Sequence, residues 1–183
     1  MKDIEKKAEE KAYQIIDTLF DLDDRIQNDN FVIPLGEVAD YLGIKTLLLD
    51  FQEEFKDNSE FATALKRKKV EGFTLRDTKV IFIDTKSKPG RQRFTVAHEI
   101  GHIVLNHLNE GNNLSIACRD SMSSPSKANL QEIEANAFAA ALLMPEPLVR
   151  WAYKISRNAH DLAMFLGVSH QAMERRLKRL GMN

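Results

Sequence analysis

The amino-acid sequence predicts an α+β fold that forms one domain with a small appendage. The chain has 183 residues, of which 43% are hydrophobic and 29% are charged, so it can bury a core of its own. Apolar residues recur at helical spacing over residues 3–26, and helix-type stretches return at 91–107 and 130–144. Between them, residues 70–75 and 79–84 are rich in strand-forming side chains. This order predicts a small, mostly antiparallel sheet with helices packed on it.

The first fifty residues give three elements. The helix predicted over residues 3–26 is followed by the breaker sequence Asn-Asp-Asn at 28–30. A short helix over 35–42 is expected to end at Gly43, a residue type that closes helices in the left-handed conformation. The apolar run over 44–51 lies between such breakers and predicts a strand.

The middle of the chain predicts a strand pair and a long loop. Residues 76–78 form a turn between the two strands, and the second strand contains a run of strong strand formers, Val80, Ile81, Phe82 and Ile83. Residues 108–129 are rich in Asn, Ser and Gly and are expected to form a surface loop.

The C-terminal part is predicted to be helical. The helix over 130–144 ends at Pro145, because proline cannot continue a helix, and the remaining residues break at Gly167 and Gly181. The predicted organisation is an N-terminal helix at 1–30, a central domain at 31–148 and a helical segment at 149–183.

Charge and cysteine content exclude several classes of protein. The formal charge of −1 argues against a protein coated in nucleic acid, and Cys118, the single cysteine, excludes an internal disulfide and a multi-cysteine zinc site. The charged N-terminus lacks the apolar stretch of a signal peptide, and no apolar run is long enough to cross a bilayer. We therefore expect a cytoplasmic protein without membrane contact.

The sequence His98-Glu99-Ile100-Gly101-His102 matches the motif H-E-x-x-H. On a helix, His98 and His102 point the same way one turn apart, so that both imidazoles can bind one Zn²⁺. Glu99 lies beside them and can take a proton from a water activated by the metal. Chance produces this motif in roughly 0.5% of chains of this length. An exposed helix with two ordinary histidines is the alternative, but the apolar flanks of the motif indicate burial.

A catalytic zinc site needs a third protein ligand. Cys118, another histidine and a downstream carboxylate are all open to that role. Glu134 shares an apolar helical stripe with Phe138 and Leu142 and is the preferred candidate, since a carboxylate on such a stripe needs a buried partner. Glu132 lies on a face that is expected to be partly wet, where it could act as a capping residue.

Two segments resemble the ImmA/IrrE family of zinc metallopeptidases: RFTVAHEIGH at 93–102 and EANAFAAALLMP at 134–145. The resemblance implies a zincin-like, gluzincin hydrolase with one zinc ion per chain, bound by His98, His102 and Glu134, with Glu99 as general base. It also implies an endopeptidase that cleaves a helix-turn-helix transcriptional repressor of phage or mobile-element type. Substrate is expected to pair with an edge strand formed by Val80, Ile81, Phe82 and Ile83 above the zinc helix.

Several further residues bear on the site. Asn136 could hydrogen-bond a zinc ligand or simply pack between helices. Arg91 and Arg93 could bind a substrate carbonyl or remain solvated. A histidine often follows the motif in the family, and His107 stands near that place without an assigned role. A Cys118 thiolate that occupies the open zinc position is a further hypothesis.

The C-terminal segment has the pattern of a helix-turn-helix, with one helix ending at Gly167 and Ser169 as N-cap of the next. Residues 150–183 hold seven basic and two acidic residues, a local charge of +5, so residues 1–149 carry −6. DNA contact through residues 160–180 is possible, but packing on the catalytic domain or on a protein partner is preferred. The alternative functions are a DNA-binding regulator on a zincin scaffold and a toxin-antitoxin-type component that binds a repressor without cutting it.

Overall fold

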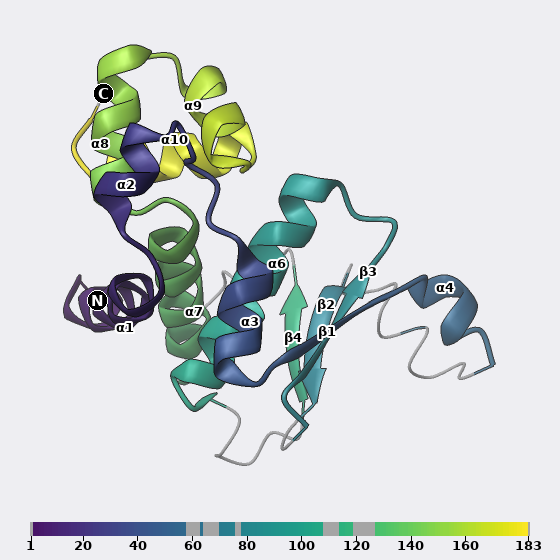
Figure 1. Cartoon of the computed structure of the whole chain (residues 1–183). Coiled ribbons are helices and arrows are strands. Elements are labelled where there is room, and N and C mark those ends of the chain that lie inside the picture. The colour runs from purple at the N-terminus through teal and green to yellow at the C-terminus, as the bar shows by residue number, and fades with distance from the viewer. Residues whose placement is uncertain are drawn as a thin grey trace.

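The computed structural model describes residues 2–57, 63, 70–75, 78–107, 114–118 and 127–182, and it confirms the α+β fold (Figure 1). Among the described helices, none is both long and apolar enough to span a membrane. The elements are α1 (Lys2–Leu19), α2 (Leu22–Gln27), α3 (Leu35–Leu42), β1 (Lys45–Leu49), α4 (Phe51–Glu54), β2 (Val70–Leu75), β3 (Val80–Asp84), α6 (Pro89–Val104), β4 (Leu114–Cys118), α7 (Lys127–Leu143), α8 (Glu146–Ile155), α9 (Ala159–Leu166) and α10 (His170–Arg179).

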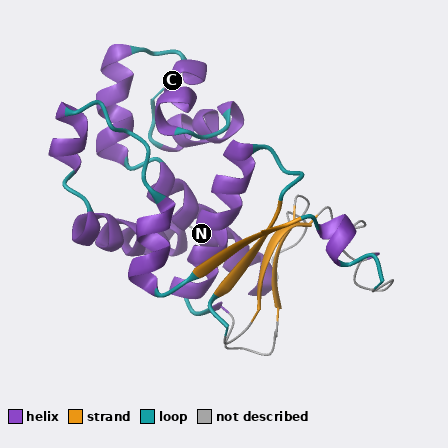
Figure 2. Cartoon of the chain, turned by 45° about the vertical axis from the view of Figure 1, so that its right-hand side comes forward, coloured by secondary structure: helices purple, strands orange, loops and turns teal. Residues whose placement is uncertain are grey.

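The sheet has the strand order β1-β3-β2-β4 and lies at one side of the molecule, with most helices on the other side (Figure 2). β2 pairs with β3 and β4 in antiparallel fashion, whereas β1 runs parallel to β3. β4 lies within the stretch predicted as a loop. The high content of Asn, Ser and Gly in this stretch led to the loop prediction and outweighed the pattern of one short strand.

The predicted edge position of the substrate strand is wrong. β3 carries Val80, Ile81, Phe82 and Ile83, and it lies between β1 and β2 rather than at an edge. Its backbone groups are used on both sides, and Ile81 and Ile83 are buried in the core. The strong strand propensity of this run reflects burial at the centre of the sheet, not accessibility to another chain.

The long N-terminal helix predicted over 3–26 is two helices. α1 ends at Leu19 and α2 starts after Asp21, whose carboxylate accepts hydrogen bonds from the backbone N–H groups of Asp23 and Asp24. This cap satisfies the first free donors of α2 and turns the chain while the apolar spacing continues.

α1 packs alongside α7 in the middle of the helical body, and the C-terminal helices close one end of it (Figure 1). One hydrophobic core contains Ala12 of α1, Phe138 of α7, Leu166 of α9 and Leu177 of α10. The predicted helix-turn-helix ends are confirmed. Gly167 adopts the left-handed conformation with φ of 64°, and Ser169 caps α10 by accepting from the N–H of Ala172.

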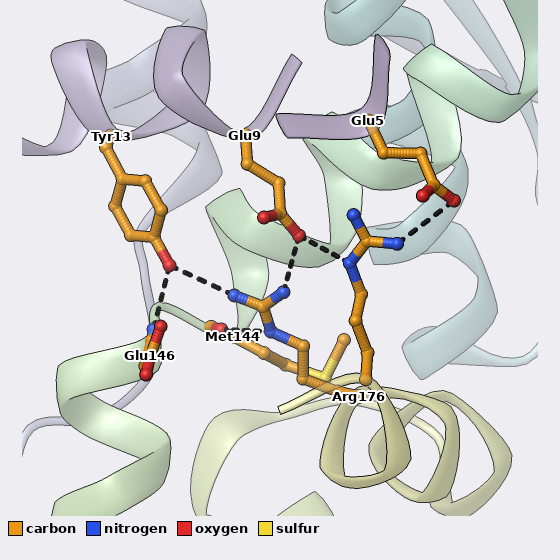
Figure 3. Close-up of polar contacts among 7 residues, drawn as sticks. Glu5, Glu9, Tyr13, Met144, Glu146 and Arg176 are labelled. Atoms are coloured by element: carbon orange, nitrogen blue, oxygen red, sulfur yellow. Dashed lines mark hydrogen bonds and ion pairs between the residues drawn. The ribbon is translucent and has the colours of Figure 1, made fainter. Parts of the chain in front are cut away.

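A buried guanidinium joins the two ends of the chain (Figure 3). Arg176 on α10 donates from Nη1 to Glu9 at 2.8 Å, from Nη2 to the Tyr13 hydroxyl at 3.0 Å and from Nε to the carbonyl of Met144 at 3.0 Å. Arg179 contacts Glu9 and Glu5 from the same helix. The predicted division at residues 30 and 148 stays a prediction, but its first and third parts are tied together by these ion pairs.

Candidate metal centre

α6 brings the motif residues to the interior. Pro89 occupies the first turn, where its missing N–H costs nothing, and the helix then runs through the motif without a break. His98 and His102 are each 4% exposed, and their Nε2 atoms lie 3.0 Å apart. The predicted arrangement of the two imidazoles on one helical face is therefore present in the structure.

Gly101 allows α7 to approach this helix closely. A Cβ at this position would lie 3.1 Å from Cδ1 of Phe138 and 3.2 Å from Cα of Ala135. Such spacing is tighter than nine in ten real Cβ contacts, so a larger residue would require α6 or α7 to give by a few tenths of an ångström. The crossing brings the first turns of α7 to the histidine pair.

Glu132, not Glu134, lies against the two histidines. Its Oε2 is 3.3 Å from Nε2 of His98, and its Oε1 is 3.2 Å from Nε2 of His102. Within the described residues, His98, His102 and Glu132 form the only group of potential metal ligands whose donor atoms converge, all within 4.8 Å of one another. The structure therefore brings Glu132 to the histidine pair, and not Glu134, which the sequence had suggested for this place.

The reason for this error is the burial of α7. Its residues from 135 onward are buried on nearly every side, so the apolar stripe of Glu134 does not mark the face toward α6. Ala135 marks that face because it touches Gly101, and Glu132 precedes Ala135 by three residues on the same side of the helix. The contact between α6 and α7 therefore determines which glutamate faces the histidines, whereas the periodicity of α7 alone does not.

Each histidine has a separate partner at its other ring nitrogen. Nδ1 of His98 lies 3.2 Å from Oδ1 of Asn136, and since an amide oxygen only accepts, Nδ1 carries a proton and Nε2 is the ring nitrogen left to bind a metal. Nδ1 of His102 lies 3.0 Å from Nδ1 of His107. His107 in turn lies 3.0 Å from Oε2 of Glu134 through Nε2.

Sequence reasoning left His107 without a role, yet it is buried beside the site at 8% exposure. It follows the end of α6, and the intervening Asn106 has a positive φ of 62° that turns the chain back. Asparagine tolerates this conformation better than most residues. In the sequence, the Asn106-His107 pair shortly after the motif could have indicated that His107 lies at the site.

Glu99 is fully buried, and neither of its carboxylate oxygens has a hydrogen-bond partner among the described residues. An unpaired buried carboxylate is costly, since folding removes its water without replacing the lost hydrogen bonds. A cation beside it, or a water molecule held by that cation, would compensate the charge. The orphaned carboxylate next to three convergent ligand atoms fits a metal site.

Burial and the neighbouring charges act on the ionisation of the cluster. Burial favours a neutral Glu132, but hydrogen bonds from His102 and His98 outweigh it and hold the pKa of Glu132 well below its usual range. Burial likewise opposes the charge on His98, yet contacts with Glu132 raise the pKa of His98 overall. Burial, with repulsion from His102, lowers the pKa of His107 to about 4.

Neither arginine before the motif is free. Arg91 forms an ion pair with Glu71 of β2 at 2.8 Å. Arg93 donates to the carbonyls of Gly167 and Ile33, and so joins α6 to the turn between α9 and α10. The backbone of Cys118 belongs to β4, but its side chain lies outside the described residues, as does most of the predicted loop around it.

Comparison with known proteins identifies the class. The family model for Peptidase_M78, described as an IrrE N-terminal-like domain, matches residues 39–178. The chain belongs to this family of metallopeptidases. It is 43% identical over 70 residues to the radiation response metalloprotease IrrE of Deinococcus radiodurans, a match that covers 38% of this chain and 20% of that protein.

A solved structure of a Mycobacterium tuberculosis transcriptional regulator has the same fold. It aligns with a TM-score of 0.58 and 19% sequence identity, covering 97% of this chain and 47% of that one. The chain thus spans about a fifth of the length of the curated relative and about half of the solved one.

Proposed function

We propose that this chain is a zinc-dependent endopeptidase with His98, His102 and Glu132 as metal ligands and Glu99 as general base. The observation that carries the proposal is the buried, unpartnered Glu99 beside three convergent ligand atoms. Membership of a metallopeptidase family supports it.

The donor set fits one zinc ion per chain. Two imidazole nitrogens and a carboxylate oxygen are the ligands of many catalytic zinc sites, which keep a fourth position open. Bonds of 2.0–2.1 Å in a tetrahedral geometry place neighbouring donors about 3.3 Å apart. The two histidine Nε2 atoms lie 3.0 Å apart; that of His98 lies 3.3 Å from Oε2 of Glu132, and that of His102 lies 3.2 Å from Oε1, distances close to that value.

Zn²⁺ at this position would supply a Lewis acid that activates water and polarises the scissile carbonyl. The proton transfers of the reaction are assigned to a residue of the chain. Glu99 accepts the proton of the attacking water and returns it to the leaving amine. Because Glu99 is buried and its carboxylate has no hydrogen-bond partner among the described residues, this carboxylate is available to the attacking water alone.

The proposed substrate is a helix-turn-helix transcriptional repressor in the cytoplasm. Extended substrate would add to a free sheet edge. β4 pairs with β2 on one side and packs near α6, so it is the edge strand beside the metal helix. DNA contact through α10 is disfavoured, because Arg176 and Arg179 are engaged with Glu9 and Glu5.

The test is incubation of the purified, zinc-loaded chain with a helix-turn-helix repressor from the same genome, followed by mass measurement of the products. We expect the wild type and the control Glu10→Gln, an exposed position on α1, to yield two fragments. Glu99→Gln should bind zinc at the same stoichiometry and leave the repressor intact. Cleavage by Glu99→Gln would refute the mechanism. An intact repressor that forms a complex with the wild type would favour the non-cleaving regulator.

A further inference from the structure

Three residues form a continuous polar chain that leads away from the proposed metal position. Nδ1 of His102 lies 3.0 Å from Nδ1 of His107, and Nε2 of His107 lies 3.0 Å from Oε2 of Glu134. These contacts run from His102 on α6 to His107, which lies shortly after the end of α6, and from there to Glu134 on α7. The side chain of His107 is 7% exposed and that of Glu134 is 28% exposed.

The carboxylate of Glu134 determines the direction of the hydrogen bonds. An ionised carboxylate only accepts, so Nε2 of His107 carries a proton that it donates to Glu134. A neutral imidazole has one N–H, so Nδ1 of His107 presents a lone pair to His102. His102 must then donate from Nδ1, which leaves Nε2, the nitrogen that lies against His98 and Glu132, as the one that can bind a metal.

We propose that His107, oriented by Glu134, is a positioning residue that fixes the tautomer and ring orientation of His102 for metal binding. The inference rests on the proposed function, because it assumes a metal held by Nε2 of His102. It gives Glu134 a role that differs from ligation, as the anchor of the second histidine. Asn136 has the corresponding position at His98.

The consequence is measurable as metal affinity. A histidine ligand whose second nitrogen donates to a fixed acceptor is held in the binding tautomer and is more basic. Loss of such a partner weakens metal binding by roughly 10–100-fold. A residue that only fills space would have no such effect when an apolar side chain replaces it.

The experiment is a competition between the full chain and a chelator of known zinc affinity. His107→Leu keeps the volume but removes the acceptor, and we expect its zinc dissociation constant to rise roughly 10–100-fold. His107→Gln retains an oxygen that accepts from His102 and an amide that donates to Glu134, so its affinity should stay within about fivefold of the wild type. His170→Gln, at an exposed position on α10, is the control and should match the wild type.

A second variant covers the case in which His107→Leu does not fold. Glu134→Ala removes the anchor at a partly exposed position, and it should weaken zinc binding while one zinc per chain still binds at saturation. Equal affinities of wild type and His107→Leu, or equal losses in His107→Leu and His107→Gln, would overturn the inference. A wild type that fails to bind zinc would instead remove the proposed function itself.

Discussion

Oε1 of Glu132 on α7 lies 3.2 Å from Nε2 of His102 on α6, whereas Glu134, two residues further along α7, reaches His107. The two glutamates therefore have different places around the same pair of histidines. One lies among the convergent ligand atoms, and the other lies behind His107.

Zinc stoichiometry separates the two glutamates. Glu132→Ala removes one of three proposed ligands, and we expect it to lose bound zinc during gel filtration in metal-free buffer. Glu134→Ala should still contain about one zinc per chain at saturating zinc, since its carboxylate does not reach the site. The measurement is metal analysis by mass spectrometry. Retention of zinc by Glu132→Ala together with its loss from Glu134→Ala would restore the assignment made from the sequence.

The ion pair between Arg176 and Glu9 predicts a stability effect. The side chain of Arg176 is 1% exposed, so Glu9→Ala leaves a buried guanidinium without its carboxylate. We expect a loss of about 3 kcal/mol in the free energy of unfolding, equivalent to roughly 6–12 °C in the melting temperature. Glu10→Ala breaks only an exposed contact with Lys6 and should change stability by less than about 0.5 kcal/mol. Equal melting temperatures for the two variants would contradict a structural role of the buried pair.

Two glycines should respond in opposite directions to alanine. In Gly72→Ala the new Cβ would lie 2.5 Å from Cγ2 of Thr95 and 2.9 Å from the backbone oxygen of Phe82, so β2 or α6 must shift. We expect a loss of roughly 1–3 kcal/mol. In Gly36→Ala, at an exposed position on α3, the Cβ meets nothing within 4 Å, and reduced backbone entropy of the unfolded chain should stabilise the protein by about 0.5–1 kcal/mol. Chemical denaturation of both variants measures the difference, and a neutral Gly72→Ala would show that Thr95 and the neighbouring strand β3 give way without cost.

The low pKa of His107 predicts a pH-dependent stability of the zinc-free protein. The folded-state pKa is about 4, below the ordinary value of 6.5, because burial disfavours the imidazolium. Between these values the unfolded chain binds more protons, so stability falls as the pH is lowered from 6.5 toward 4. From pH 7 to pH 5 we expect the wild type to lose roughly 1–2 kcal/mol more than His107→Gln. Thermal melts across this pH range test the difference, and identical slopes for the two proteins would show that folding does not lower the pKa of His107.

Local features of the fold were predictable from the sequence. Gly43 and Gly167 end their helices in the left-handed conformation, and Ser169 caps α10, as residue type alone suggested. These elements depend on hydrogen bonds between residues close in the chain, so a short stretch of sequence contains all the partners.

Pairings across long distances in the sequence were not predictable in the same way. The placement of β3 between β1 and β2 depends on strands from three segments, and propensity does not distinguish a central strand from an edge. The anchoring of Arg176 on Glu9 joins residues from the two ends of the chain. A basic residue on α10 therefore contributes to the core rather than to a charged surface.

The sequence by itself determined the chemistry of the site: two histidines one helical turn apart, with a glutamate beside them. That follows from helix geometry, since spacing of four residues places both imidazoles on one face wherever the helix lies. Only the tertiary structure decided which glutamate of α7 faces them and which residue holds His102. The first choice depends on the close approach of α7 to α6 at Gly101, and the second depends on the turn at Asn106 that brings His107 back to the site; neither contact is contained in the sequence pattern.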